Sequence, residues 1–231
     1  KSGSGYVNGQ TDIIITAPGL TAQVEAQIHP WQINLFERNL INIGSDDGIV
    51  EENADHTSLQ YGHLYAPRPL REATYAVAGE AEDNTLYGTP DLVRDAESGV
   101  EVSSVNHSPI LGWAHDGNPI YGPYGFTNND GSGSIVEMKS GYELKPNETN
   151  RPPLSLYPAG FFTEDYQFIG NGDLDEHNGR FAITPDYPKG IYAYHATIKS
   201  QNDATGPFEG FRRPEFPYFI GATYKSKPNP F

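Results

Sequence analysis

Four histidines and four carboxylates, gathered in three short stretches, are the side chains of this chain most able to do chemistry. The stretches span residues 106–125, 170–181 and 190–197. Carboxylate oxygens are the ligands that calcium prefers, whereas imidazole nitrogens favour zinc or copper. The stretches therefore predict a site for a divalent cation (calcium, zinc or copper), provided that the fold brings them together. The candidate ligands are His107, His115, Asp116, Asp173, Asp175, Glu176, His177 and His195.

The first two stretches have local features that limit what they can form. Residues 116–119, Asp-Gly-Asn-Pro, are typical of a tight turn, because glycine accepts a positive φ and the Asn-Pro pair fixes an extended exit. Such a turn would hold His115 and Asp116 at the mouth of a hairpin. The second stretch does not match a helix-loop-helix calcium loop, since the sixth residue counted from Asp173 is not glycine and the twelfth is not glutamate.

Each stretch also has a purely structural interpretation. The first is then a turn whose aspartate caps backbone N–H groups, and the second is a solvated acidic loop. In the third, a strand would place Tyr192 and Tyr194 on one face and Ala193 and His195 on the other. A core strand with one hydrogen-bonded histidine is the interpretation we favour for that stretch.

Composition narrows the class of protein. The 231 residues contain no Cys, which excludes thiolate chemistry and disulfides, and the formal charge of −15 disfavours nucleic acid as a partner. No apolar run approaches the roughly 20 residues of a membrane-spanning helix, so we expect no membrane span. The first residues contain neither an initiator Met nor a signal peptide, so we expect a part of a longer polypeptide.

The 25 Gly and 19 Pro favour short strands and tight loops over long helices. A helix is predicted over residues 23–43, because Trp31, Leu35, Phe36 and Leu40 follow one apolar stripe. We therefore expect a mainly β, irregular β-sandwich-like domain with Gly/Pro-rich loops and one or two short helices. The predicted strands cover residues 13–16, 135–138, 161–168, 180–184, 190–198 and 218–224.

Three motifs, taken in order, resemble the signature segments of the YHYH domain. They are His-Asp-Gly-Asn-Pro-Ile-Tyr-Gly at residues 115–122, Asp-Glu-His-Asn-Gly-Arg-Phe at 175–181 and Tyr-Ala-Tyr-His at 192–195. This copy departs from the family name at Ala193, where the tetrad should have a second histidine. It also has His177 where many cellular relatives have Cys. The loss of the histidine at position 193 weakens the case for an inherited metal-dependent activity.

A wider likeness covers nearly the whole chain. The blocks at 60–68, 139–144 and 225–231, with Gly-Ser-Gly-Tyr at 3–6, resemble the YHYH-containing segment of very large tail-associated virion proteins from phages of marine cyanobacteria. The resemblance implies that residues 1–22 end a preceding β-rich module or linker, and that residues 23–231 form the YHYH-like domain.

The same resemblance implies a virion structural module, in a tail or tail fibre, that mediates subunit packing or host-surface contact. Its partners would be other virion proteins, copies of itself or a host-surface glycan, and it would be extracellular once assembled. A metal-binding domain or metal-dependent enzyme is the less favoured alternative, and a glycan-binding module is the third. The candidate surface and ligand contacts are Trp113, Tyr121, Tyr124, Tyr192 and Tyr194.

Overall fold

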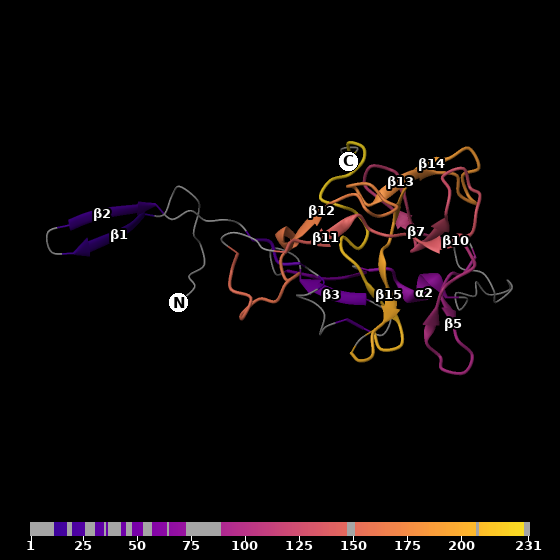
Figure 1. Ribbon diagram of the computed structural model, residues 1–231, viewed down its shortest axis with the longest axis horizontal. Helices are drawn as coiled ribbons and strands as arrows, with labels where there is room; N and C mark the ends of the chain where they lie inside the picture. The colour runs from indigo at the N-terminus through magenta and orange to yellow at the C-terminus, as the bar shows by residue number, and fades with distance from the viewer. Residues whose placement is uncertain are drawn as a thin grey trace.

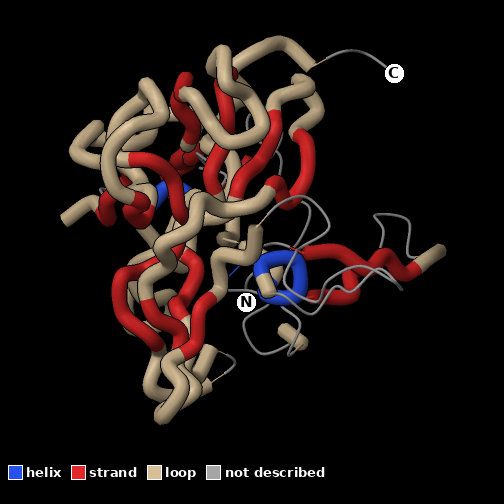
Figure 2. The backbone as a smooth tube through the Cα atoms, turned by 90° about the vertical axis from the view of Figure 1, so that its right-hand side faces the viewer, coloured by secondary structure: helices blue, strands red, loops and turns tan. Residues whose placement is uncertain are grey.

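The structure, a computed structural model, is mainly β (Figures 1 and 2). It describes residues 12–17, 20–25, 31–34, 36, 43–44, 48–52, 57–63, 65–72, 89–146, 151–206 and 208–228. Figure 2, in which strands and loops alternate, shows how little of the chain is helical. The mainly β, irregular sandwich-like fold predicted from the Gly and Pro content is confirmed.

One four-stranded sheet positions the signature motifs. Its strands are β7 (Ile110–Trp113), β8 (Pro119–Tyr121), β13 (Gly179–Ala182) and β14 (Ile191–His195), in the order β13-β14-β8-β7. Strand β14 runs antiparallel to β13 and parallel to β8, and β8 is antiparallel to β7. In Figure 1 these strands lie in the upper part of the molecule, above β15, α2 and β5. All three motifs therefore contribute to one sheet.

The remaining strands form two-stranded ribbons. They are β1 (Asp12–Ala17) with β2 (Leu20–Glu25), β3 (Gly48–Glu52) with β4 (Leu59–His63), β5 (Val93–Arg94) with β6 (Glu101–Val102), β9 (Tyr124–Phe126) with β10 (Ile135–Glu137), β11 (Tyr142–Leu144) with β12 (Tyr166–Phe168), and β15 (Ile198–Asn202) with β16 (Arg212–Pro214). The short helices are α2 (Arg68–Arg71) and the 3₁₀ turn η2 (Thr163–Asp165).

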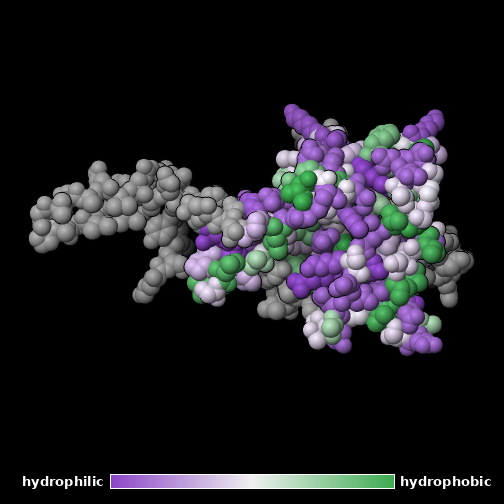
Figure 3. All heavy atoms as spheres, in the orientation of Figure 1, coloured by the Kyte–Doolittle hydropathy of each residue, from purple (hydrophilic) through white to green (hydrophobic). Residues whose placement is uncertain are grey.

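Tyrosine and phenylalanine supply much of the buried bulk. Tyr121 packs with Ile110 and Ala193 beneath the four-stranded sheet. Tyr65 packs with Phe36 and Phe208 in a second cluster, whose Phe36 and Tyr65 rings meet edge to face at 4.8 Å. The surface seen in Figure 3 mixes hydrophilic and hydrophobic residues, with hydrophilic ones predominating, in keeping with the high negative charge.

A buried ion-pair network connects α2 to the segment before β5 and to strand β6. Arg71 Nε donates to Asp91 at 2.9 Å and Arg71 Nη2 donates to Glu101 at 2.8 Å, and the three side chains are at most 2% exposed. The Ser108 hydroxyl donates to the other oxygen of Asp91 and accepts a bond from the Tyr124 N–H at 2.7 Å. The network therefore connects α2 to β9, which follows the first motif.

The predicted helix over residues 23–43 is wrong at its start. Residues 23–25 belong to β2, whose backbone pairs with the isoleucine-rich β1, and Ile33 forms an isolated bridge with Phe162. The apolar stripe begins only at Trp31, so it gave no reason to start the helix at residue 23. Phe36 is helical, and residues 26–30, 35 and 37–42 lie outside the described residues. The domain boundary expected after residue 22 falls inside β2.

Most predicted strands are present, with two departures. The segment 161–168 contains η2 before β12 begins at Tyr166. The strand predicted over residues 218–224 is wrong, because that segment forms turns and bends. Tyr218 has a φ of 76°, which ends any extended run, and the Gly221 N–H donates to the carbonyl of His177 rather than to a strand.

Candidate functional site

Strand β14 presents the Tyr-Ala-Tyr-His tetrad to both sides of the sheet, as the alternation of side chains predicts. Ala193 and His195 point to the inner side, where both are about 1% exposed. Tyr192 and Tyr194 point to the opposite side, and Tyr194 is fully buried there. The tetrad therefore contributes to two different environments.

On the side of the tyrosines, the three motifs meet through hydrogen bonds. The Tyr194 hydroxyl donates to Asp116 at 2.7 Å, and the Tyr192 hydroxyl donates to Asp175 at 2.7 Å. Burial opposes ionisation of both aspartates, but hydrogen bonds, that from the tyrosine foremost, outweigh it and lower each carboxyl pKa. The pKa of each tyrosine is raised, by burial first and then by its aspartate. Both aspartates are therefore anionic acceptors that hold the tetrad in place.

Residues 222–228, which we call the strap, cover this network. The Lys225 N–H donates to the Tyr194 hydroxyl at 2.7 Å, and the Ser226 N–H donates to Asp116 at 3.1 Å. The Lys225 ammonium lies 3.1 Å from Asp175 and 5.0 Å from the centre of the Tyr192 ring. The strap thus supplies a further donor to each of the two aspartates.

On the inner side, two histidines lie close together with defined tautomers. His195 Nδ1 lies 3.0 Å from the Gly122 carbonyl, and His107 Nδ1 lies 2.9 Å from the Ser108 carbonyl. Because a carbonyl can only accept, each Nδ1 carries the proton and each Nε2 keeps its lone pair. The two rings are 6.2 Å apart, and Tyr121 stacks on His195 at 5.8 Å. Metal-binding histidines often have this arrangement, with Nδ1–H bonded to a carbonyl and the Nε2 lone pair directed at the metal. A metal site would also need a third ligand.

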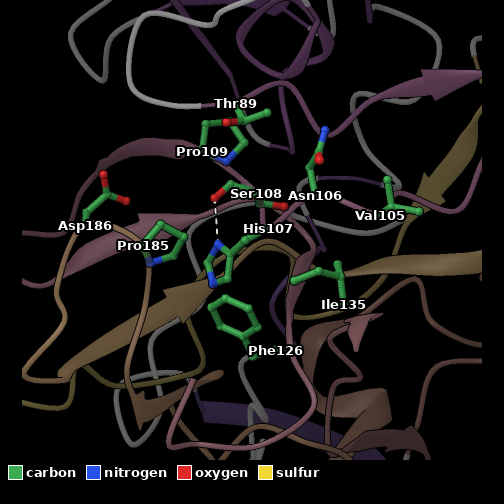
Figure 4. Close-up of a pocket in the computed structure, with 10 residues that line it drawn as sticks. All are labelled: Thr89, Val105, Asn106, His107, Ser108, Pro109, Phe126, Ile135, Pro185 and Asp186. Atoms are coloured by element: carbon green, nitrogen blue, oxygen red, sulfur yellow. Dashed lines mark hydrogen bonds between the residues drawn. The ribbon is translucent and has the colours of Figure 1, made fainter. Parts of the chain in front are cut away.

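A cavity of about 440 Å³ opens beside His107. Figure 4 shows the imidazole pointing into it, next to Phe126 and across from Asp186, with its bond to the Ser108 carbonyl dashed. Burial lowers the pKa of His107, and burial followed by His107 and Arg180 lowers the pKa of His195 to about 3. Both imidazoles are therefore neutral at neutral pH.

Arg180 is not among the predicted site residues. It lies on β13, facing inward, and is 8% exposed. One Nη2–H donates to the carbonyl of Phe126, and within the described ranges no carboxylate lies within ion-pair distance of the guanidinium. The sequence signal for its inward position was strand alternation, because Arg180 precedes Phe181 in the motif Asn-Gly-Arg-Phe and Phe181 points outward. A cation at this place disfavours a second cation between the histidines.

The predicted metal ligands do not converge. Across the residues whose placement is described, no group of three or more His, Asp or Glu side chains could hold a metal ion. Asp173 accepts the Lys139 N–H, His177 Nδ1 contacts the Thr223 carbonyl, and the His115 ring packs on Tyr224. Glu176 lies 3.7 Å from His177 Nε2. Asp173, His177 and His115 thus contact other parts of the chain, and these contacts contribute to the structure of the loops.

The predicted surface aromatics divide into two groups. Trp113 is 52% exposed and Tyr192 is partly exposed. The prediction is wrong for Tyr121, Tyr124 and Tyr194, which are at most 1% exposed. They fill the space that aliphatic side chains fill elsewhere, and so they are not free to contact a ligand.

Fold and site together define a class: an irregular β domain organised around a central Tyr-Ala-Tyr-His strand whose tyrosines bind two aspartates. The sequence model described as YHYH protein matches residues 18–204, and this chain belongs to that family. No curated protein and no solved structure matches the chain. Among the described residues, no helix is both long and apolar enough to cross a membrane.

The first prediction concerns the link between tetrad and strap. Tyr194→Phe removes a donor to Asp116 and an acceptor for the Lys225 N–H, and we expect it to lower the free energy of unfolding by about 1–3 kcal/mol. Urea denaturation measures this loss. Tyr157→Phe, at a tyrosine 37% exposed, is the matched control and should change stability by less than about 0.5 kcal/mol. Equal effects of the two variants would contradict the role of the Tyr194 hydroxyl.

Proposed function

We propose that this domain is a structural module of a tailed-phage virion, in the tail or a tail fibre, and that it packs against other virion proteins or copies of itself. Membership of the YHYH family and the likeness of its sequence blocks to tail-associated proteins support this context. The signature tyrosines bind signature aspartates, and no group of three potential metal ligands occurs among the described residues, which supports a structural role over a catalytic one.

The observation that carries the proposal is the exposed face of the β3–β4 ribbon. Val50 lies directly across from Tyr61, and Leu59 is two residues before Tyr61, so the three side chains share one face. They are 59%, 55% and 74% exposed, respectively. On the other face Ile49 is buried. A ribbon that buries one apolar face and exposes another is suited to packing against a neighbouring subunit.

The alternatives have less support. For the metal-binding hypothesis, the described part of the chain places no third ligand beside His107 and His195. The glycan-binding hypothesis rests on Trp113, Tyr121 and Tyr124, but Tyr121 and Tyr124 are buried in the core. The excess of negative charge gives no reason to add nucleic acid as a partner.

The second prediction tests the ribbon face. The double variant Val50→Thr with Leu59→Ser should fold but associate at least about tenfold more weakly, because burying one Leu side chain is worth about 1.5–3 kcal/mol. Association is measured by analytical ultracentrifugation at a series of protein concentrations. Incorporation is measured by recovery of the tagged chain in purified particles. Leu154→Ser, at a leucine 64% exposed outside the ribbon, is the matched control. Absence of the wild-type chain from purified particles would refute the virion role.

A further inference from the structure

Three cavities share Tyr142 as a common wall. Their volumes are about 420, 600 and 590 Å³. The first two also share Glu215 and Lys199, and the last two also share Tyr166 and Phe216. We call the combined space the Tyr142 groove. Each cavity has the size of a small-molecule site, and their succession suits an extended ligand.

A packed aromatic cluster forms one end of the Tyr142 groove. Phe216 is at its centre, stacked on Tyr166 with ring centres 4.0 Å apart and planes within 6°. Tyr142 and Tyr218 each meet the Phe216 ring edge to face, at 5.4 and 5.7 Å. All four rings are partly exposed. Because the rings hold one another in place, they present fixed aromatic surfaces to a ligand at little entropic cost.

The charged side chains of the groove are nearly balanced, in contrast to the strongly negative chain. Four carboxylates and three cations line it: Glu137, Glu143, Glu164 and Glu215, with Lys139, Lys199 and Arg213. Near balance favours neither a polyanion nor a polycation as the ligand.

Three of these charged groups are available to a ligand. In the described part of the structure, the Glu215 carboxylate and the Lys139 and Lys199 ammonium groups make no hydrogen bond or ion pair. Burial, followed by the nearby Glu137, raises the pKa of Glu215. A half-buried carboxylate without a donor gains most from a ligand that brings hydroxyl groups.

We propose that the Tyr142 groove binds a neutral oligosaccharide. The C–H faces of sugar rings, which are weakly positive, stack on the negative faces of aromatic rings such as Tyr166. Sugar hydroxyl groups both donate and accept, so they can bond to Glu215 and to Lys199 at once. The inference rests on the proposed virion role only for the source of the sugar, a host-surface glycan.

Binding of cello-, malto-, laminari- and mannotetraose to the whole chain, followed by NMR chemical shifts and calorimetry, tests the proposal. We expect at least one of them to bind, and Tyr166→Ala to weaken its affinity by roughly tenfold, the equivalent of one aromatic contact. Lys199→Ala, at an exposed side chain that leaves the fold intact, should weaken binding by several-fold. Lys189→Ala and Trp113→Ala, both outside the groove, should leave affinity unchanged.

Three results would overturn the groove proposal. The first is that no tetrasaccharide binds, and the second is that Trp113→Ala abolishes binding while Tyr166→Ala and Lys199→Ala do not. The third is that an extended peptide binds more tightly and displaces the sugar from the groove. None of these results bears on whether the chain is found in purified particles. If the chain binds a glycan but is absent from purified particles, the groove proposal stands and the proposed virion role is refuted.

Discussion

Arg71→Met is expected to lower the free energy of unfolding by about 3–5 kcal/mol, because it leaves two buried carboxylates without a cation. Asp91 and Glu101 are at most 1% exposed and both bind the Arg71 guanidinium. Burial favours the neutral form of Arg71, but the two carboxylates outweigh it and raise the arginine pKa. Removing the cation makes the carboxylates take up protons or unfold the region, and Asp91 also holds Ser108 against β9.

The same substitution at an exposed pair gives the control. Arg94 binds Glu72, with side chains 45% and 23% exposed, and Arg94→Met should cost less than about 1 kcal/mol. Urea denaturation at neutral pH compares the two variants. Adding Asp91→Asn and Glu101→Gln to Arg71→Met should recover part of the loss, since no buried charge then lacks a partner. A loss at Arg71 no larger than at Arg94 would show that the network does not stabilise the fold.

Local patterns in the sequence predicted the parts of the site that depend on neighbours along the chain. Strand alternation placed Tyr192 and Tyr194 opposite His195. The predicted tight turn is present but lies two residues earlier, over residues 114–117, where the Gly117 N–H donates to the Ala114 carbonyl at 2.9 Å. What brings Asp116 to Tyr194 is the parallel pairing of β14 with β8, 70 or more residues away in sequence. No local periodicity encodes that pairing, and so the meeting of the motifs could be expected only from their resemblance to a family.

The same limit applies to the predicted metal ligands and surface aromatics. A carboxylate beside a histidine in sequence is compatible both with coordination and with a capped loop, and only the fold decides which partner is nearer. Asp175 accepts bonds from Tyr192 and from Lys225, whose position 50 residues later has no sequence signal. Tyr121 lies in a Gly/Pro-rich segment and is buried, whereas Tyr166 lies in the strand predicted over residues 161–168 and lines a groove. Neither outcome follows from the neighbouring residues in sequence.

Acid should destabilise the protein through its buried histidine pair. His195 has a pKa of about 3 in the fold against 6.5 for an ordinary histidine, and the pKa of His107 is also lowered. Between these values the unfolded chain binds a proton at His195 that the folded chain does not, and the lowered pKa of His107 acts in the same direction. Stability therefore falls as pH decreases below 6.5, by about 1.4 kcal/mol per pH unit for each fully unprotonated histidine. Above that pH both states are neutral and the effect vanishes.

The groups around the pair determine the sign. Burial, the His107 imidazole and Arg180 oppose protonation of His195, and only its contact with the Gly122 carbonyl favours it. Burial and Arg180 oppose protonation of His107, whereas the Ser108 carbonyl and Asp186 favour it. His195→Gln keeps a polar side chain but cannot take up a proton. As the pH falls from the ordinary histidine pKa towards the range where carboxylates titrate, the free energy of unfolding of this variant should therefore decline less steeply than that of the wild type. His115→Gln, at an exposed ring, is the control and should retain the wild-type slope. Urea denaturation across this pH range compares the three proteins, and parallel curves for wild type and His195→Gln would mean that water or an anion reaches the imidazole and offsets its burial.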